Sequence, residues 1–500
     1  MKHLIIVCYA WLLNLYRKPL LLSNTTLKLI YIPGFNRLRH FNGKVRAYAE
    51  FIKAKKHVPG YAAFLASKDF DRPSFTGWTP NIHEIPFTDK NNYVKQHDMA
   101  SRCVGGSIPE TGVIFDESSG SSGKATNWVR GIKERAKNAK MIKFGVENLL
   151  GTDPIFVINA FALGPWATGI NISMTSVKFA KLKSIGPDKA KIENTIKDFG
   201  TDHHYVIMGY PPFLKMLVDD SEIDWTAHHV TFIFGGESMT ENLRDYILSK
   251  GVNRVYSSLG ASDLELNLAA ENDFTISLRR LLRDNEALRT RLLQHTGALP
   301  MIFQYNPTDF LFETTEQGEL IVTVCRTDYL APKIRYNIHD RGHSVQVQEV
   351  YNLLDELGID HNSLEKPKTD IPLLFHYGRA DMSVSFFGSN ISPVDVQEAL
   401  FSLPELTEKV NSFCFNTVED HEGNKQLIVN LEVQNNKTFA GLNLEMIKQR
   451  FFDQLSKVNQ DFREARRMVK DINQMAMNLY DFAQGPFAEN DIRIKAKYIA

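Results

Sequence analysis

A stretch rich in serine and glycine surrounds one lysine at residues 117–126, Glu-Ser-Ser-Gly-Ser-Ser-Gly-Lys-Ala-Thr, shortly after the apolar segment Thr111–Phe115. Gly120 and Gly123 can take backbone angles that let amide groups converge on an anion, while hydroxyl groups and Lys124 add donors and positive charge. This composition suits a loop that binds the phosphates of a nucleotide. Because the spacing is not G-x-x-x-x-G-K-[ST], a P-loop NTPase is not indicated, and a flexible linker stays open as the alternative.

Short apolar runs alternate with helical patterns through most of the chain, and this alternation predicts parallel α/β layers. Runs typical of strands lie at residues 155–161, 206–208, 230–234 and 318–324. Glu241–Ser249 has the spacing of an amphipathic helix. Strand and helix patterns restart after Tyr377–Asp381. We therefore predict two domains, a large mixed α/β domain of residues 1–377 and a small α+β domain of residues 378–500.

The composition excludes some classes of function. The chain has 500 residues, of which 43% are apolar and 23% charged, as in ordinary globular proteins with more than one domain. Basic and acidic residues balance at 58 each, so no overall field attracts nucleic acid or an anionic membrane. Ser277–Leu293 carries five arginines, but Asp284, Glu286 and leucines at helical spacing interrupt them, which favours a solvated helix face.

The cysteines bear on the compartment. They lie far apart without a C-x-x-C pair, at Cys8, Cys103, Cys325 and Cys414. This spacing favours free thiols in a reducing compartment, and we expect a cytoplasmic protein.

The N-terminus carries a strongly apolar run, Leu4–Leu13, which is too short to span a bilayer. Asn14, Arg17 and Lys18 interrupt the run, and no signal-peptide cleavage pattern follows at a suitable distance. We predict a packed or peripheral amphipathic helix here rather than a targeting segment, and no membrane span.

Four further polar clusters follow the Gly/Ser stretch along the chain. They are Gly235-Gly236-Glu237-Ser238 after the run Val230–Phe234, Leu259-Gly-Ala-Ser-Asp263, Pro332-Lys-Ile-Arg335-Tyr336-Asn-Ile-His-Asp340, and Gly378-Arg379-Ala-Asp381 with Gly388 and Ile391-Ser-Pro393. In this order, the clusters resemble the adenylate-forming superfamily of acyl-CoA synthetases and adenylation domains, from about Lys44 to the C-terminus. Thr126 and the element Val58-Pro59-Gly60-Tyr61 make the phenylacetate–CoA ligase branch the most similar one.

The resemblance implies a two-step activity and a small, mobile C-terminal domain. In the first step a small carboxylic acid attacks the α-phosphate of ATP and pyrophosphate leaves. In the second step the acyl adenylate is captured by a thiol, either of coenzyme A or of the phosphopantetheine on an acyl carrier protein. ATP, Mg²⁺ and one of these thiols are the expected cofactors, and the chemistry needs positioning and charge neutralisation more than a protein nucleophile.

The resemblance also implies the residues of the site. The phosphates would be held by Ser118, Ser119, Gly120, Ser121, Ser122, Gly123 and Lys124. The nucleoside would be bound by Gly235, Gly236, Glu237, Ser258, Leu259, Gly260, Ala261 and Ser262, with Asp340 on the ribose hydroxyls. Arg379 would assist from a hinge at Asp381. Phe161 and Trp166 would stack on an aryl or other apolar acid, although a core contact is equally open for both.

Two positions depart from the family pattern. Leu259 stands where an aromatic residue commonly flanks the adenine, and Asp263 is one methylene shorter than the usual glutamate but keeps a hard oxygen ligand for Mg²⁺. The Gly-Lys pattern of the late catalytic lysine is absent, so Lys495 and Lys497 are both candidates.

Two alternatives remain open at the level of sequence. Asn459–Arg463, Gly485–Phe487 and a late lysine have a more distant similarity to acyl-amido synthetases, in which an amine is the acceptor. A nucleotide- or acyl-binding pseudoenzyme is the other alternative, because of the departures at Leu259 and in the lysine pattern.

Overall fold

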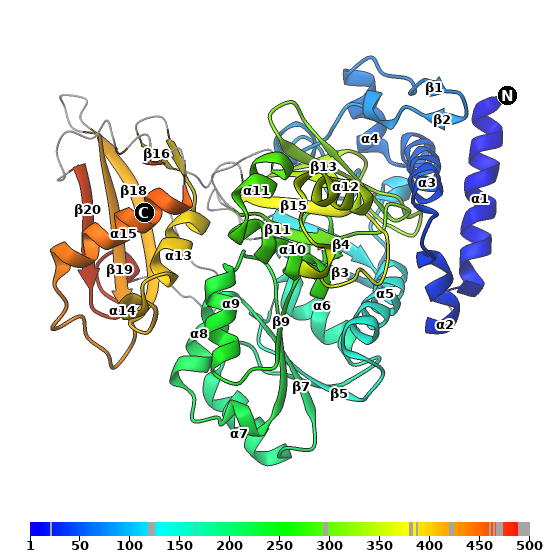
Figure 1. Ribbon diagram of the computed structural model, residues 1–500. Helices are drawn as coiled ribbons and strands as arrows, with labels where there is room; N and C mark the ends of the chain where they lie inside the picture. Colours follow the sequence, from blue (N-terminus) through cyan, green and yellow to red (C-terminus); the bar gives the residue numbers. More distant parts are fainter. Residues whose placement is uncertain are drawn as a thin grey trace.

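The structure, a computed structural model, describes residues 1–20, 23–118, 126–164, 166–293, 299–379, 384–386, 389–419, 425–459, 462–463, 466 and 474–488. These residues form a large unit built on one mixed sheet and a smaller unit near the C-terminus (Figure 1). The predicted fold class is confirmed. Within these ranges, no helix combines the length and the apolar character that crossing a lipid bilayer needs.

An eleven-stranded sheet forms the centre of the large unit, in the order β12-β13-β14-β15-β11-β10-β9-β8-β7-β5-β6. Its strands are β5 (Ile155–Asn159), β6 (Lys181–Ser184), β7 (His204–Gly209), β8 (His229–Phe234), β9 (Arg254–Ala261), β10 (Glu265–Ala270), β11 (Met301–Gln304), β12 (Phe310–Thr314), β13 (Glu319–Val324), β14 (Tyr336–Val345) and β15 (Leu373–Arg379). The strands from β6 to β9 pair in parallel, and the others pair antiparallel. Every residue of β5 and β7 is buried, which is why the sequences of both strands are mostly apolar.

Helices connect these strands, and a hairpin lies beside the sheet. The helices are α5 (Ile132–Leu150), α6 (Ala167–Ser176), α7 (Lys189–Phe199), α8 (Pro211–Asp220), α9 (Glu241–Ser249), α10 (Asp273–Asp284), α11 (Glu286–Leu292) and α12 (Val347–Leu357). The hairpin joins β3 (Val113–Ser118) to β4 (Thr126–Gly131). Helix α9 has the bounds that its amphipathic pattern predicted, because Thr240 caps its first turn by accepting a hydrogen bond from the Leu243 N–H.

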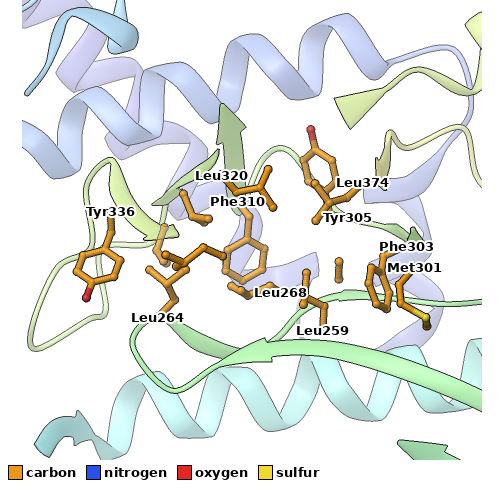
Figure 2. Packing of buried hydrophobic residues seen from close by; sticks show 14 of the residues in the cluster. Leu259, Leu264, Leu268, Met301, Phe303, Tyr305, Phe310, Leu320, Tyr336 and Leu374 are labelled. Carbon is orange, nitrogen blue, oxygen red and sulfur yellow. The ribbon is translucent and has the colours of Figure 1, made fainter. Parts of the chain in front are cut away.

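Apolar side chains of β9, β10, β11 and β12 pack together in the core of the large unit. Figure 2 shows Leu259 of β9 and Leu268 of β10 beside Met301 and Phe303 of β11 and Phe310 of β12. All five are buried. This packing fixes β9 and β10 relative to their neighbours, so the turn that joins them has a defined position.

The N-terminal helix α1 (Lys2–Leu20) packs along α3 (Asn36–His57) at the outer edge of the large unit (Figure 1). The helix predicted for the N-terminus is thus confirmed. Arg17 donates hydrogen bonds of 2.9 and 2.7 Å to the two carboxylate oxygens of Asp309, and Arg46 of α3 donates another of 3.1 Å to the same group. This buried cluster ties α1 to the core. The segment continues through α2 (Asn24–Leu27), the 3₁₀ helix η1 (Lys28–Tyr31), α4 (Pro59–Ser67) and the short strands β1 (Phe75–Thr76) and β2 (Thr79–Pro80).

The smaller unit has a hydrophobic core of its own, formed by residues between Val384 and Met477. Its elements are β16 (Val384–Phe386), β17 (Ser389–Ile391), α13 (Pro393–Phe401), α14 (Pro404–Thr407), β18 (Val410–Glu419), β19 (Lys425–Val433), α15 (Leu444–Val458) and β20 (Met475–Tyr480). Strand β15 of the large sheet continues to Arg379, and the proposed hinge residue Asp381 lies outside the described residues. We keep the domain division near residue 378 as a proposal.

The prediction for the arginine-rich segment Ser277–Leu293 was wrong in detail. The chain forms two helices there, because Asn285 leaves α10 and its side chain caps α11. Arg279 is buried rather than solvated and donates a 2.7 Å hydrogen bond to Glu241. The four cysteines are free, as predicted.

The buried cluster around Asp309 can be tested by its contribution to stability. Removing this carboxylate leaves two buried guanidinium groups without a charge partner, so we expect Asp309→Asn to lower the free energy of unfolding by about 3–5 kcal/mol. Asp71 is a matched control, because it also contacts two basic side chains, Lys55 and Arg72, but is 69% exposed where Asp309 is 6% exposed. Urea denaturation of Asp71→Asn should match that of the parent.

The same cluster predicts how stability depends on pH. Burial by itself raises the pKa of Asp309, but the guanidinium groups of Arg17 and Arg46 hold it below the ordinary range. The stabilisation is therefore present above the unfolded-state pKa of about 3.9 and is lost as the pH falls through the lower folded-state value. Equal unfolding curves for the Asp309 and Asp71 variants would contradict this account.

Candidate functional site

A cavity of about 730 Å³ opens at the carboxyl ends of β8 and β9, where open α/β sheets place their ligands. The polar segments of these strand ends and of β14 line it together, namely Gly235, Gly236, Ser258, Gly260, Ala261, Ser262, Asp263 and Asp340. These residues come from three segments of the chain. The fold thus brings most of the predicted nucleoside residues to one place.

The two glycines after β8 are required by the packing of the protein itself. A Cβ on Gly235 would lie 2.9 Å from the carbonyl oxygen of Ser258, and a Cβ on Gly236 would lie 2.7 Å from the ring of Tyr210. Gly236 also has a φ of +81°, which L side chains rarely adopt. Burial and the nearby Glu237 carboxylate raise the pKa of Tyr210 to about 12, so this phenol stays neutral beside the turn.

Asp263 follows β9 and lines the cavity with a carboxylate that already has two partners. Tyr336 donates a 2.9 Å hydrogen bond to one oxygen, and the Lys90 ammonium lies 3.3 Å from the other. Burial, followed by the nearby Asp263 charge, raises the pKa of Tyr336 well above its usual value, which keeps it a donor. Asp263 is therefore held in one orientation at the edge of the cavity.

The turn that carries Asp263 is clamped from the side by Arg130 of β4. This guanidinium donates hydrogen bonds to the carbonyl oxygens of Ser262 and, at 2.6 Å, of Leu264, and it lies 3.4 Å from Asp116 of β3. The hairpin β3–β4 is thereby fixed against the end of β9. The last paired residues of the hairpin are Ser118 and Thr126. The predicted phosphate residues between them, 119–124, lie outside the described residues, and so does the side chain of Ser118.

Asp340 lies in β14 between two cavities. The nitrogen Nε2 of His376 in β15 lies 2.9 Å from its carboxylate oxygen Oδ2. The second cavity, of about 150 Å³, is lined by Glu237 and Leu259 of the large unit and by Pro393 of the smaller one. Arg379 pairs with Asp340 through the backbone, and its side chain is outside the described residues.

Apolar side chains also line the larger cavity, and we call the part of the cavity that they line the apolar chamber. Phe161 lines this chamber and meets Tyr210 edge to face, with ring centroids 4.9 Å apart. Other apolar lining residues are Ile142, Phe144, Ile172, Met208 and Ile233. Trp166 is not among the lining residues, and its backbone instead forms a bridge with Glu117 of β3. Of the two predicted aromatic residues, the structure brings only Phe161 to the chamber.

The described residues do not form a resident metal site. They contain no group of three or more His, Cys, Asp or Glu side chains that could hold a metal ion. Mg²⁺, however, is often held by one or two carboxylates together with the phosphates of a substrate. Asp263, a single carboxylate at the cavity edge, fits an ion that arrives with a nucleotide.

Several residues of the site were missed at the level of sequence. Lys90, Arg130 and His376 were not named, and Tyr336 was quoted within a motif but given no role. Each acts through a contact with a residue distant in the chain, and Tyr336 itself is 73 residues from its partner Asp263. The late candidates Lys495 and Lys497 lie outside the described residues.

Comparison with known proteins identifies the fold. A scan against protein-family models and a search of curated proteins returned no match. Among solved structures, the chain is similar to 2-hydroxyisobutyryl-CoA ligase in its postadenylation state with R3-HIB-AMP, with a TM-score of 0.66 and 12% identity over 94% of this chain and 90% of that one.

The same ligase is matched in two further states. Its open conformation with 2-HIB-AMP and CoA gives a TM-score of 0.53 at 13% identity, over 94% of this chain and 92% of that one. Its thioesterification state gives 0.52 at 13% identity, over 94% and 90%. At such identities the likeness shows the fold alone, and the chain has the fold of adenylate-forming ligases.

Proposed function

We propose that this protein is an adenylate-forming ligase that joins a carboxylic acid to the α-phosphate of ATP, releases pyrophosphate and then passes the acyl group to a thiol. The observation that carries the proposal is one cavity whose lining combines the carboxylates of Asp263 and Asp340 with the apolar side chains around Phe161. Such a cavity can hold an acid against a nucleotide, which is what the first half-reaction requires.

The polar end suits the parts of ATP. Asp340 is an acceptor-only group and suits the two hydroxyl donors of a ribose. The smaller cavity beside Glu237 and Leu259 has room for a flat base against the backbone of Gly236. Asp263 lines the larger cavity from the turn that Arg130 ties to the hairpin.

We place the phosphates between the Gly/Ser stretch and Asp263. The stretch connects the ends of β3 and β4, and Arg130 of β4 fixes this hairpin against the turn at Ser262. Mg²⁺ carried with ATP would be held by Asp263 and would neutralise phosphate charge. Lys495 and Lys497 remain the candidates for the late lysine.

The apolar chamber indicates the class of acid. Its walls are aromatic and aliphatic side chains, and the cavity as a whole is within the size range of sites for drug-sized ligands. Phe161, which is 3% exposed, and Tyr210 both line the cavity and meet edge to face, which gives an aryl group an aromatic pair to contact. We therefore propose an aryl or other apolar carboxylic acid, as in the phenylacetate–CoA ligase branch.

The smaller unit would serve the second half-reaction. It meets the large unit through polar contacts, such as the 3.2 Å hydrogen bond from the Thr240 N–H to Gln397 and the 2.6 Å hydrogen bond from Gln434 to Asp219. Interfaces of this polar kind permit reorientation of a domain. This conformation is more similar to the postadenylation state of 2-hydroxyisobutyryl-CoA ligase than to that ligase's open or thioesterification state, and by analogy with those states we propose that the smaller unit reorients for the second half-reaction. Coenzyme A or a phosphopantetheine thiol is the proposed acceptor.

The first half-reaction can be tested by acid-dependent exchange of labelled pyrophosphate into ATP, with a panel of aryl and aliphatic acids. Asp340→Asn should raise the apparent KM for ATP about 10- to 100-fold, because loss of a charged acceptor costs on the order of 1.5–3 kcal/mol. Asp355→Asn is the matched control, since Asp355 also pairs with a histidine, His361, at 2.7 Å but lies on α12 outside both cavities.

The control should exchange like the parent. Exchange that is absent with every acid would mean a pseudoenzyme. Equal ATP dependence in the Asp340 and Asp355 variants would make Asp340 a structural residue.

The apolar chamber can be tested with the pair of aromatic residues that the fold separates. Phe161→Ala should raise the KM for the best acid about 10-fold or more while the KM for ATP changes little, because an apolar contact with the acid is lost. Trp166→Ala should leave the KM for the acid near that of the parent. The reverse order of effects would place the acid elsewhere, and thermal melting of both variants separates this effect from unfolding.

A further inference from the structure

The solvent-facing side of α1 carries a strip of apolar residues that runs along most of the helix. The exposed apolar residues are Met1, just before the helix, and Leu4, Ile5, Cys8, Trp11, Leu12, Leu15, Tyr16 and Pro19, and the exposed lysines Lys2 and Lys18 lie near the two ends. The spacing of three and four among the apolar residues places them on one side of the helix. A surface helix ordinarily shows the opposite arrangement, with its apolar stripe toward the core.

Polar contacts on the inner side of α1 prevent the helix from turning this face inward. Tyr9 donates a 3.0 Å hydrogen bond to Asn42, and the ring nitrogen Nδ1 of His3 lies 3.1 Å from the hydroxyl of Tyr48. Arg17 is buried against Asp309 by two hydrogen bonds. Rotation would break all three contacts and would remove Arg17 from the buried carboxylate of Asp309. The exposed apolar face is therefore a fixed feature of the fold.

The charged side chains of the N-terminal segment that includes α1 are all basic. Residues 1–49 contain eight lysines and arginines and no aspartate or glutamate, although the chain as a whole has no net charge. Arg17, Arg39 and Arg46 are buried and paired with aspartates. The exposed basic residues Lys18, Lys28, Arg37 and Lys44 form no ion pair within the part of the chain that the structure describes. The segment thus presents an apolar strip together with uncompensated positive charge.

We propose that α1 docks on the surface of an anionic lipid bilayer, lying parallel to it with its exposed face among the acyl chains near the headgroups. An apolar helix face flanked by lysines is the pattern of interfacial helices, and basic residues near the surface add attraction to anionic lipids. Trp11 and Tyr16 belong to the residue types that favour the interface between membrane and water. Figure 1 shows α1 at the outer edge of the molecule, on the side away from the smaller unit.

The test is sedimentation of the full-length protein with vesicles of phosphatidylcholine, with and without about one quarter phosphatidylserine. We expect binding to the anionic vesicles, weaker by at least tenfold with neutral ones and weakened by salt. Trp11→Glu/Leu12→Glu should reduce binding to anionic vesicles at least tenfold, because it places two charges in the apolar face. Lys18→Gln should reduce it about fivefold.

The control is Val177→Glu/Met446→Glu, which adds the same charge at apolar residues of similar exposure away from α1. Val177 and Met446 are 62% and 55% exposed, against 64% and 53% for Trp11 and Leu12. This variant should bind vesicles like the parent. Analytical ultracentrifugation without lipid measures whether the protein dimerises, which tests the alternative that a second copy of this chain covers the apolar face of α1.

Three results would overturn the proposal. The first is no binding to either kind of vesicle. The second is equal binding to neutral and anionic vesicles, which would remove the role of charge. The third is a dimer that Trp11→Glu/Leu12→Glu dissociates, together with no lipid binding by the parent, which would assign the face to self-association.

Discussion

Strands β8 and β9 end so close together that no side chain fits between them, and the cavity depends on this contact. The strands pair in parallel up to Phe234 and Ser257, which brings Gly235 against the carbonyl oxygen of Ser258. The chain must then turn away, and Gly236 makes the turn with a positive φ. Two polar segments consequently lie side by side at one edge of the sheet, and the space beyond them is left for a ligand.

Buried ion pairs hold the helices that support this edge. Arg244 of α9 donates hydrogen bonds of 2.8 and 3.0 Å to Glu271, which follows β10 and lines the cavity. Glu241 of α9 accepts a hydrogen bond from Arg279 of α10. Burial by itself raises the pKa of Glu241, but Arg244 and Arg279 lower it to about 2, so the carboxylate stays charged. Breaking such a pair would leave a buried charge without a partner, which costs several kcal/mol. The arrangement around β9 is therefore rigid. A rigid polar end is what positioning of a nucleotide requires.

The sequence predicted those features that depend on local pattern. Apolar runs identified β5, β7 and β8 because buried parallel strands have no polar face, and the amphipathic spacing of Glu241–Ser249 identified α9. The prediction of a single helix over Ser277–Leu293 was wrong, because Asn285 ends α10 and its side chain caps α11.

Features that depend on contacts between distant segments were not predictable in this way. The partners of Asp263 come from residues 90 and 336, and no local pattern connects those positions. The position of Trp166 was not predictable either. Its aromatic side chain suggested a place in the acid pocket, but its backbone forms a bridge with β3 instead. The outward apolar face of α1 follows from the contact of Arg17 with Asp309, 292 residues away. In each case the sequence indicated which residue types were present, but their positions in the fold depend on tertiary contacts that the sequence pattern does not show.

The central claim is that a carboxylate in this cavity attacks the α-phosphate of ATP, and the fate of a labelled carboxylate oxygen tests it most directly. The full-length protein is incubated with ATP, coenzyme A and an aryl acid whose carboxylate carries oxygen-18, and the nucleotide products are weighed by mass spectrometry. The account predicts AMP that contains one oxygen-18 atom, because the P–O bond formed in the adenylate stays with AMP when the acyl group leaves. Unlabelled AMP, or ADP as the nucleotide product, would contradict it.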